Sequence, residues 1–562
     1  MPLVYVKSSG TRVSGESTPG DWSDANCYPR VSASVSAWTG NTQVVLNDEI
    51  INETTPVGTS AFASLTSLSI EKRGASSASA IWSMNSATSP LINTAPTAAQ
   101  TFSASDIVFT RAVPMSAAAT TALLAFAGTG HSAITFTRCT FGPMSINGFL
   151  GGLNASVLSV QGAPASCSVL FDQCAVVGIN HISAGTGPWF RLGGTGHSFT
   201  FVDCVWRDSA YLATAAMASA FGILPENAQT FEFTRCRVRD VSVQGASAAA
   251  YVRCFFLTPS SAQTVRINEF LFERVVIGSL DNPIESQGWG FYLSGPYTVD
   301  GLHSRHCIYY DTGGRDGGQI YFNGPSAVGR AQNLSAKHCR SRSGAALFSS
   351  NGAGGVYSRV LAMWCQSEAG VIYSGGYGDF ELRAAIAAYN KPFDGAIALN
   401  GMGIYARNNA ATRNKTIRII NSTVVGNQTN GSCAGIAIEN NDATYSCTGY
   451  VINCISRNSG STNDIKSTKT AAGALTVTAT TCNAASGIAV DNNVGEIVGD
   501  PKFIGGPNPT TARGFRLKSS SPLIGAGTGY LAGSCVHRDF DGRRHLRPPN
   551  IGAFATGFGD QK

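Results

Sequence analysis

Two aspartates of this chain have the spacing that paired acid catalysis would require. Asp208 and Asp240 each follow a cysteine by four residues and are 32 residues apart. In coils of that length their carboxyl groups would lie one strand spacing apart, about 4.8 Å, and their proximity would raise the pKa of one of them, as a general acid requires. A glycosidase places its two carboxylates about 5–5.5 Å apart for retention or about 6.5–9.5 Å apart for inversion. The alternative is that both aspartates bond backbone amides at a strand end and pair with adjacent arginines.

A second acidic group lies in the glycine-rich stretch 309–317. Asp311 and Asp316 belong to this stretch, and Glu285 and Glu368 could join them from neighbouring coils. We therefore treat Asp208, Asp240, Asp311 and Asp316 as the candidate catalytic carboxylates.

A lyase would instead need a basic group near calcium or an arginine cluster. The basic residues that could line one wall are His303, Arg305, His306, Lys337, His338 and Arg340. His306 and His338 each precede a cysteine and are 32 residues apart, so we expect both to face outward on adjacent coils. Two stacked histidines could bind a metal, but a pair of solvated neighbours is the simpler interpretation.

Aromatic residues are crowded in the middle of the chain and are candidates for carbohydrate binding. Rings on a long wall could stack on sugar faces and lose little entropy when ordered. Some of them, such as Trp206, alternate with inward positions and are expected in the core. The candidates that lie in glycine-rich segments and are expected to be exposed are Trp289, Tyr292, Tyr310, Tyr321 and Tyr377.

The spacing of the cysteines reveals the repeated structural unit that must position these residues. The chain has 15 of them, with no CxxC pair, and eight share a frame with an apolar or small residue three positions before and another two positions after. Phe136-Thr-Arg-Cys139-Thr-Phe141 is the clearest copy, and Phe272-Glu-Arg-Val275-Val-Ile277 carries valine in place of cysteine. Because valine cannot ligate a metal or act as a nucleophile, the shared position predicts buried thiols that pack as small hydrophobes.

The copies recur about every 32 residues, and a period of 20–50 residues indicates a repeat architecture. Within a copy the residues favour strands, and the polar pair before the cysteine breaks the alternation, which predicts a corner of the chain. Helical solenoids, leucine-rich repeats and propellers lack their patterns here. The sequence predicts an all-β parallel β-helix whose like residues stack in interior ladders.

The composition agrees with this fold and excludes several classes of protein. Charged residues are 13% of 562 residues and glycines number 63, which disfavours a helical bundle or coiled coil. The net charge of +6 comes with no basic cluster, so we expect no nucleic-acid partner. No apolar stretch reaches the length of a membrane span, so we expect no membrane insertion, and the N-terminus shows no signal peptide.

Motifs at both ends resemble a known family, the right-handed parallel β-helix repeat proteins (pectate-lyase-like solenoids). At the start, the family's opening pattern is matched by Val4-Tyr-Val6, Ser9-Gly10 and Gly20-Asp-Trp22-Ser-Asp-Ala25. At the end, its closing pattern is matched by Asp500-Pro-Lys-Phe503, Phe515-Arg-Leu517, Ser521-Pro-Leu-Ile-Gly-Ala-Gly527, Asp539-Phe-Asp-Gly542, Arg547-Pro548 and Ile551-Gly-Ala-Phe554. Phe554 replaces an acidic residue of the family pattern.

The resemblance implies a right-handed parallel β-helix of about 32 residues per coil with short capping segments. We expect an N-terminal cap or attachment segment over 1–40, the β-helix over 41–498 and a closing segment over 499–562. No cofactor is expected, although Asp539 and Asp541 could form a calcium site. The alternative there is Asp-Gly turns and an Arg547–carboxylate contact that close the last coil.

The family includes polysaccharide lyases, bacterial surface proteins and bacteriophage spikes, so the fold alone leaves the function open. Many unpaired cysteines and no export signal favour a protein made in the bacterial cytosol. We therefore expect a bacteriophage virion spike or fibre, a homotrimer by resemblance, that binds a host-surface glycan, contacts other virion proteins and could cleave the glycan. The alternatives are a secreted, extracellular polysaccharide lyase or hydrolase, and a purely structural or decoration protein of a particle.

Overall fold

The computed structural model is an all-β parallel solenoid with about 32 residues per turn, as the sequence predicted. The chain divides into two compact units, unit 1 (1–286) and unit 2 (287–562). Within the described residues, helix is limited to α1 (Thr59–Phe62) and the 3₁₀ turns η1 (Ser32–Ala37) and η2 (Ala512–Phe515). The structure describes residues 2–12, 14–18, 21–72, 80–115, 122–127, 129–148, 156–160, 166–183, 189–193, 196–213, 223–226, 230–245, 251–252, 254–257, 264–279, 285–286, 289–310, 317–392, 402–409, 412–428, 433–457, 462–528, 538–544 and 548–555.

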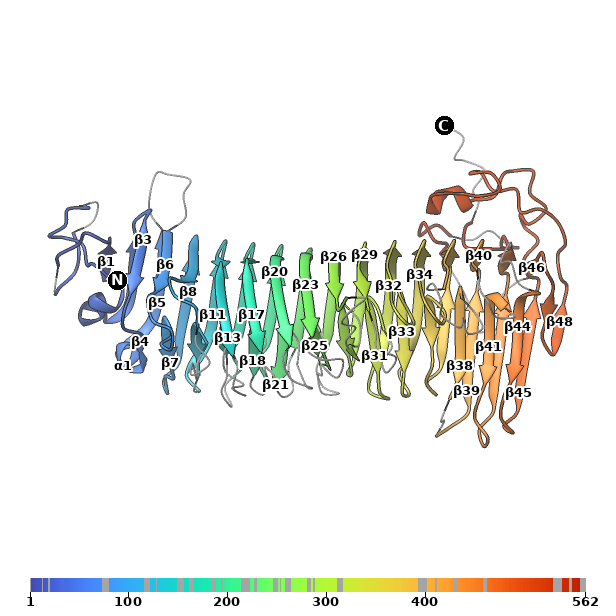
Figure 1. The fold of residues 1–562 in the computed structure, drawn as a ribbon, viewed down its shortest axis with the longest axis horizontal. Helices are drawn as coiled ribbons and strands as arrows, with labels where there is room; N and C mark the ends of the chain where they lie inside the picture. The colour runs from blue at the N-terminus through green and yellow to red at the C-terminus, as the bar shows by residue number, and fades with distance from the viewer. Residues whose placement is uncertain are drawn as a thin grey trace. The chain divides into compact units, whose positions relative to one another are not determined.

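Unit 1 stacks its strands in parallel, each beside its counterpart in the next coil (Figure 1). The first stack contains β1 (Leu3–Val6), β2 (Gly40–Leu46), β5 (Leu65–Lys72), β8 (Gln100–Ser105), β11 (His131–Thr137), β15 (Ser168–Asp172), β19 (Ser198–Val202), β22 (Thr230–Thr234) and the start of β26 (Val265–Ile277). The strands that follow in each coil are β3 (Ile50–Glu53), β6 (Ala80–Met84), β9 (Ile107–Arg111), β12 (Thr140–Phe141), β13 (Met144–Gly148), β16 (Ala175–Val177), β17 (Ile179–Ser183), β20 (Val205–Ala213) and β23 (Arg237–Gly245). A second sheet closes the coils with β4 (Val57–Gly58), β7 (Ile92–Thr94), β10 (Leu124–Phe126), β14 (Leu158–Val160), β18 (Phe190–Gly193), β21 (Ile223–Glu226) and β25 (Phe255–Leu257), and β24 (Tyr251–Val252) pairs with β27 (Glu285–Ser286).

Unit 2 repeats this plan with its own strands. Its first stack contains β29 (Tyr297–Arg305), β32 (Val328–Lys337), β34 (Gly354–Met363), β36 (Phe380–Arg383), β39 (Lys415–Ile420), β42 (Cys447–Ile452), β45 (Leu475–Thr480) and β48 (Asn492–Val494). The shorter strands after it are β30 (Ile308–Tyr309), β37 (Ile386–Ala388), β40 (Thr423–Val425), β43 (Ile455–Arg457) and β46 (Asn483–Ala484). The second sheet contains β28 (Phe291–Leu293), β31 (Ile320–Asn323), β33 (Leu347–Ser350), β35 (Ile372–Ser374), β38 (Ile404–Asn408), β41 (Cys433–Asn440), β44 (Asn463–Lys469) and β47 (Ile488–Ala489).

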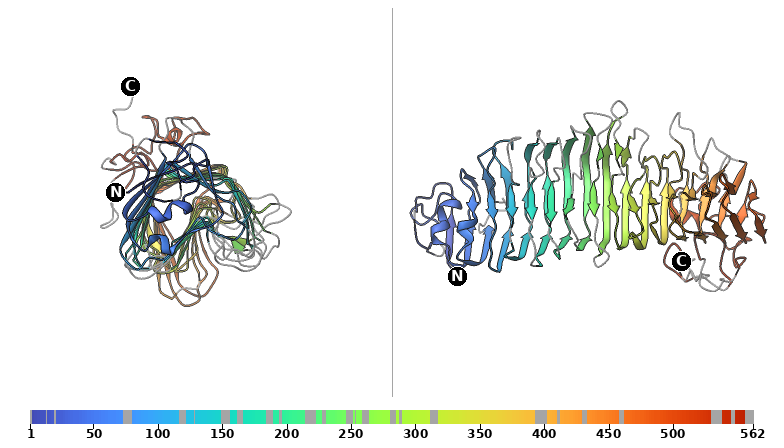
Figure 2. Two further views of the ribbon diagram at one scale, coloured as in Figure 1. Left: turned by 90° about the vertical axis from the view of Figure 1, so that its left-hand side faces the viewer. Right: turned by 90° about the horizontal axis from the view of Figure 1, so that it is seen from below.

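Interior ladders of like side chains hold together the stacked coils of each unit, and Figure 2 shows the ribbon of these coils. In unit 1, Phe136, Phe171, Phe201 and Phe233 are buried and stack in sequence, with ring centroids 5.3, 4.6 and 5.0 Å apart. Beside them the cysteine thiols donate to backbone carbonyls of the preceding coil, as Cys174 Sγ does to the Phe136 oxygen at 3.3 Å. All fourteen described cysteines are buried, which confirms their predicted packing role, and Cys535 lies outside the described residues.

Nine coils turn at two corners that lie five residues apart, both with a residue in the left-handed region, and the coils of Asp106, Arg138, Asn453 and Thr481 have such a residue at the first corner. In unit 1 the first corner carries Asp106, Arg138, Gln173, Asp203, Arg235 and Glu269, and the second carries Gly178, Asp208, Asp240 and Arg274. In unit 2 the first corner carries Gly301, Asn333, Arg359, Ala384, Asn421, Asn453 and Thr481, and the second carries His306, His338, Trp364, Tyr389 and Gly426. The predicted corner before each ladder cysteine is therefore confirmed. Corner side chains differ in exposure: Asp208, His306 and His338 are exposed, whereas Asn421 and Asn453 are buried.

The valine copy of the repeat was placed wrongly by sequence. Leu271 pairs with Arg237, so the residues just before them, Phe270 and Cys236, occupy equivalent positions in adjacent coils. Phe270 therefore holds the interior position after the first corner. Val275 instead pairs with Val241, just after the second corner. The two corners have the same local pattern, an outward residue followed by a small or apolar buried one, and a search for that pattern cannot tell them apart.

The closing segment packs on the side of unit 2, where Figure 1 shows it beside the strands. Its buried apolar residues are Phe503, Phe515, Leu517, Leu523, Ile551, Ala553 and Phe554. They cover outward residues of four coils, which are Leu361, Met363, Ile386, Ala388, Val425 and Ile455. The Ala553 amide also donates to Thr423 Oγ1 at 3.0 Å. The segment thus gives unit 2 a wall that lies along several coils.

Candidate functional site

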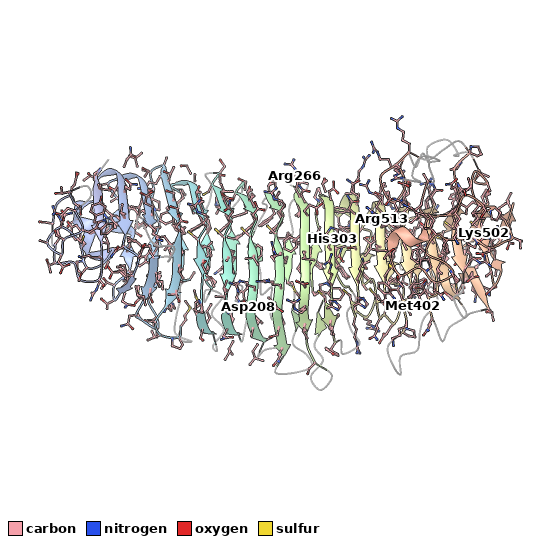
Figure 3. All side chains as sticks on the ribbon, turned by 90° about the horizontal axis from the view of Figure 1, so that it is seen from above. Asp208, Arg266, His303, Met402, Lys502 and Arg513 are labelled. Carbon is pink, nitrogen blue, oxygen red and sulfur yellow. The ribbon has the colours of Figure 1, made fainter. Side chains whose placement is uncertain are left out.

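The two candidate catalytic aspartates lie where the sequence spacing placed them, at the second corner of adjacent coils in unit 1. Figure 3 labels Asp208 on the outer surface of that unit. Its carboxylate pairs with Arg207 at 2.5 Å, whereas Asp240 receives two hydrogen bonds, of 2.6 and 2.8 Å, from Arg274 of the next coil. The Arg274 guanidinium lowers the pKa of the Asp240 carboxyl group. A general acid would need the opposite direction.

The first corner of unit 1 also carries arginine–aspartate ion pairs between adjacent coils, and none of these aspartates was a catalytic candidate. Arg138 binds Asp106 through two hydrogen bonds of 2.7 and 2.6 Å, and Arg235 binds Asp203 in the same way at 2.8 and 2.7 Å. Aspartate tolerates the left-handed conformation, which explains its use at these corners. The geometry favours Asp208 and Asp240 as members of a corner ion-pair system, the alternative raised from sequence, over an acid–base pair.

Most of the other carboxylate candidates lie outside the described residues. Asp311 and Asp316 lie outside the described residues, as does the Glu285 side chain. Glu368 is described and accepts a hydrogen bond from Arg342 Nε at 3.0 Å. The described residues therefore leave the second acidic group as a sequence prediction.

Three of the five aromatic candidates are buried, contrary to the expected exposure. Trp289 is fully buried, and its Nε1 donates to Ser304 Oγ at 3.1 Å. Tyr292 and Tyr321 are each 7% exposed and stack on each other with centroids 5.1 Å apart. Phe348 continues this stack beside Tyr321 at 4.6 Å, so these tyrosines present their faces to one another and not to solvent.

The two remaining aromatic candidates are half-buried. The Arg340 guanidinium lies over the Tyr310 ring, 4.8 Å from its centroid. The Tyr377 ring lies where a side chain at Gly352 would otherwise stand. Each ring thus has one face or edge in contact with the protein and keeps part of its surface accessible.

The second corner of unit 2 carries a ring ladder, defined here as His306, His338, Trp364 and Tyr389. Successive centroids are 5.1, 4.9 and 6.2 Å apart, and the interplanar angles are 6°, 6° and 20°. The two histidines are exposed, as predicted, and the two larger rings are half-buried. Tyr389 ends the ladder against Phe515 of the closing segment, with centroids 6.2 Å apart.

Sequence reasoning identified the histidine pair but missed Trp364 and Tyr389. The available signal was their position, because each directly precedes a small buried residue, Cys365 or Asn390.

Positive charge surrounds the ring ladder. The strand position just before the corner is held in successive coils by Arg305, Lys337, Met363 and Ala388. The bridge position after the corner is held by Ile308, Arg340, Gln366 and Lys391. None of these flanking positions is acidic. Arg305 and Lys337 have no carboxylate partner among the described residues. Burial, His306 and Lys337 together lower the pKa of His338.

The candidate calcium ligands are engaged by the protein. Asp539 is buried and accepts hydrogen bonds from the Arg543 amide at 2.6 Å and the Ala555 amide at 2.9 Å. Burial raises the pKa of its carboxyl group. Asp541 pairs with Arg516, and Arg547 lies outside the described residues. No group of three or more histidine, cysteine or acidic side chains in the described part of the chain is placed to hold a metal ion.

Neither a protein-family model nor a curated protein sequence matches this chain. Across the described ranges, no helix is long and apolar enough to cross a membrane. The site must therefore be interpreted from its own geometry. A row of exposed and half-buried rings, beside Arg305 and Lys337 with no carboxylate partner among the described residues, can bind an extended ligand by contacts repeated from coil to coil.

Proposed function

We propose that the chain is a β-solenoid spike or fibre protein of a bacteriophage particle that binds a polysaccharide of the host surface. The observation that carries the proposal is the ring ladder on an exposed corner of unit 2. A polysaccharide repeats along its length, and a solenoid corner offers one equivalent position per coil, so both surfaces are periodic. The buried, reduced cysteine ladder is consistent with folding in a reducing cytosol before release.

Binding is favoured over hydrolysis as the main role. The carboxylates with catalytic spacing are ion-paired at a corner, and the Asp240 pKa is lowered. A secreted lyase or hydrolase and a purely structural particle protein remain as alternatives that experiment can separate.

The test is binding of the full chain to immobilised capsular and lipopolysaccharide preparations from candidate hosts, with parallel assays for new reducing ends and for unsaturated products. We expect saturable binding to at least one preparation without release of either product. Product release would establish an enzyme, and absence of binding across a panel that contains the host glycan would refute the proposal. Mass spectrometry of purified particles tests the virion assignment, and light scattering of the purified chain tests the expected homotrimer.

A further inference from the structure

The ring ladder places bulky residues in a backbone conformation that they rarely adopt. His306, His338, Trp364 and Tyr389 have φ values of 54°, 52°, 55° and 57°. Glycine, asparagine or aspartate occupies such positions with less strain, and glycine does so at Gly426 on the next coil of the same corner. Arg235, Glu269 and Arg274 adopt the same conformation at corners of unit 1, so the conformation belongs to the corner. What distinguishes these four consecutive coils is that each places a ring there.

The positively charged residues around the ring ladder indicate that its ligand is negatively charged. Arg305 and Lys391 are exposed and Lys337 is half-buried, and the described residues offer no carboxylate to any of the three. At the corners of unit 1, by contrast, arginines are matched by aspartates at 2.6–2.8 Å. A cation beside the ladder would meet like charge, which disfavours a metal between the two histidines, and an anion would meet opposite charge.

The stacking of the rings narrows the ligand class further. Nucleic-acid platforms offer open aromatic faces on which bases stack. Here the faces of neighbouring rings are turned to each other at centroid distances of 4.9–6.2 Å, so mainly their edges face outward. Imidazole N–H groups at such edges, together with Arg305 and Lys337, can donate to carboxylates spaced along an extended chain.

We infer that the second corner of unit 2 binds a carboxylated glycan, with its acidic groups against Arg305, Lys337 and the two ladder histidines. This inference rests on the proposed polysaccharide-binding function and adds the charge class and the place of contact. The imidazole N–H groups of His306 and His338 add hydrogen-bond donors to the same edge, next to Arg305, Lys337 and Arg340.

The experiment compares dextran with carboxymethyl-dextran, two probes that share a backbone and differ in their carboxylates. We expect the full chain to bind carboxymethyl-dextran and to bind dextran at least about tenfold more weakly, since two charge-assisted contacts of about 0.7 kcal/mol each correspond to tenfold. The double variant R305Q/K337Q should lose about tenfold in affinity for carboxymethyl-dextran. The matched control R266Q/K518Q removes the same charge from exposed sites elsewhere and should keep the wild-type affinity. Circular dichroism and the urea midpoint verify that all variants fold.

A second variant tests the histidines. The double variant H306F/H338F keeps both rings and removes the imidazole donors, so it should bind carboxymethyl-dextran more weakly than the wild-type chain at pH 7.5. Equal binding of both dextrans, tighter binding of single-stranded DNA, or an equal loss in R305Q/K337Q and in the control would overturn the inference and leave the proposed function standing. Failure to bind any host glycan would overturn the proposed function itself.

Discussion

Two buried histidines of unit 1 make its stability sensitive to acid. His131 and His181 are 6% and 1% exposed, and both ring nitrogens of each are buried with no hydrogen-bond partner among the described residues. Aromatic rings lie beside them, with Phe126 5.4 Å from His131 and Tyr211 4.9 Å from His181 between centroids. Burial lowers the pKa of His131 to about 4 and that of His181 to about 3, and no charged group contributes to either shift.

The direction of the effect follows from proton binding. In the unfolded chain both histidines titrate near pH 6.5, whereas in the folded chain they stay neutral until about pH 4 and 3. Between these values the unfolded state binds more protons, so the free energy of unfolding falls as the pH falls below 6.5. Each histidine costs about 1.4 kcal/mol per pH unit in that window, which gives about 2 kcal/mol at pH 5 and about 4 kcal/mol for the pair.

The variants H131F and H181F keep an aromatic ring and remove the titration. We expect each to reduce the loss of stability between pH 7 and pH 5 by about 2 kcal/mol, and the double variant by about 4 kcal/mol. The measurement is the urea midpoint followed by intrinsic fluorescence at both pH values. H306F, which changes an exposed histidine of unit 2, is the control and should leave the pH dependence of the fluorescence signal unchanged. An identical loss between pH 7 and pH 5 in the wild type and in H131F/H181F would refute the reasoning.

Three further predictions concern other buried or paired groups. Burial raises the pKa of the Cys167 thiol to about 12, so iodoacetamide at pH 7.5 should leave it unmodified in the native chain and modify it in urea, as peptide mass spectrometry would reveal. Burial lowers the pKa of Lys415 to about 7, so stability should rise between pH 7 and pH 10 as the unfolded state keeps the extra proton, and urea midpoints should show that K415M lacks this rise. D240N breaks an exposed pair with Arg274 and should cost about 1 kcal/mol or less in urea unfolding, and any glycan cleavage should survive it; loss of cleavage with normal folding would restore Asp240 as a catalytic residue.

The solenoid was predictable because its interior repeats strictly. A phenylalanine, an outward residue and a cysteine recur at nearly constant spacing, and stacking in register requires that recurrence. The separation of 39 residues between Cys236 and Val275 was the sign that the pattern had changed corner. Cys236 to Phe270 is 34 residues, and five more residues lead to the second corner, which accounts for the 39.

The exposure of the aromatic candidates was not predictable from glycine-rich context. Glycine marks a loop in some places and a close approach of two backbones in others. Beside Trp289, a side chain at Gly290 would stand 1.8 Å from the Gln319 carbonyl oxygen of the next coil. This glycine allows two coils to touch and helps to bury the tryptophan. Whether a glycine marks a loop or a close approach depends on the register of the neighbouring coil, and a short sequence segment does not contain that register.

The second corner carries different residues in the two units. This difference identifies the candidate functional surface more clearly than the presence of aromatic residues alone. Unit 1 places Asp240 and Arg274 on adjacent coils, where they neutralise each other. Unit 2 places rings at its second corner and leaves Arg305 and Lys337 beside them without carboxylate partners in the part of the chain that is described. Charges that already neutralise each other attract a ligand weakly, whereas cations without a carboxylate partner among the described residues can still attract an anion. A second aromatic stack, Tyr292 with Tyr321, shows that rings alone are insufficient, because it is buried on a flat face of the coil. Position at the corner and unmatched charge together make the ring ladder the place where this solenoid can meet another molecule.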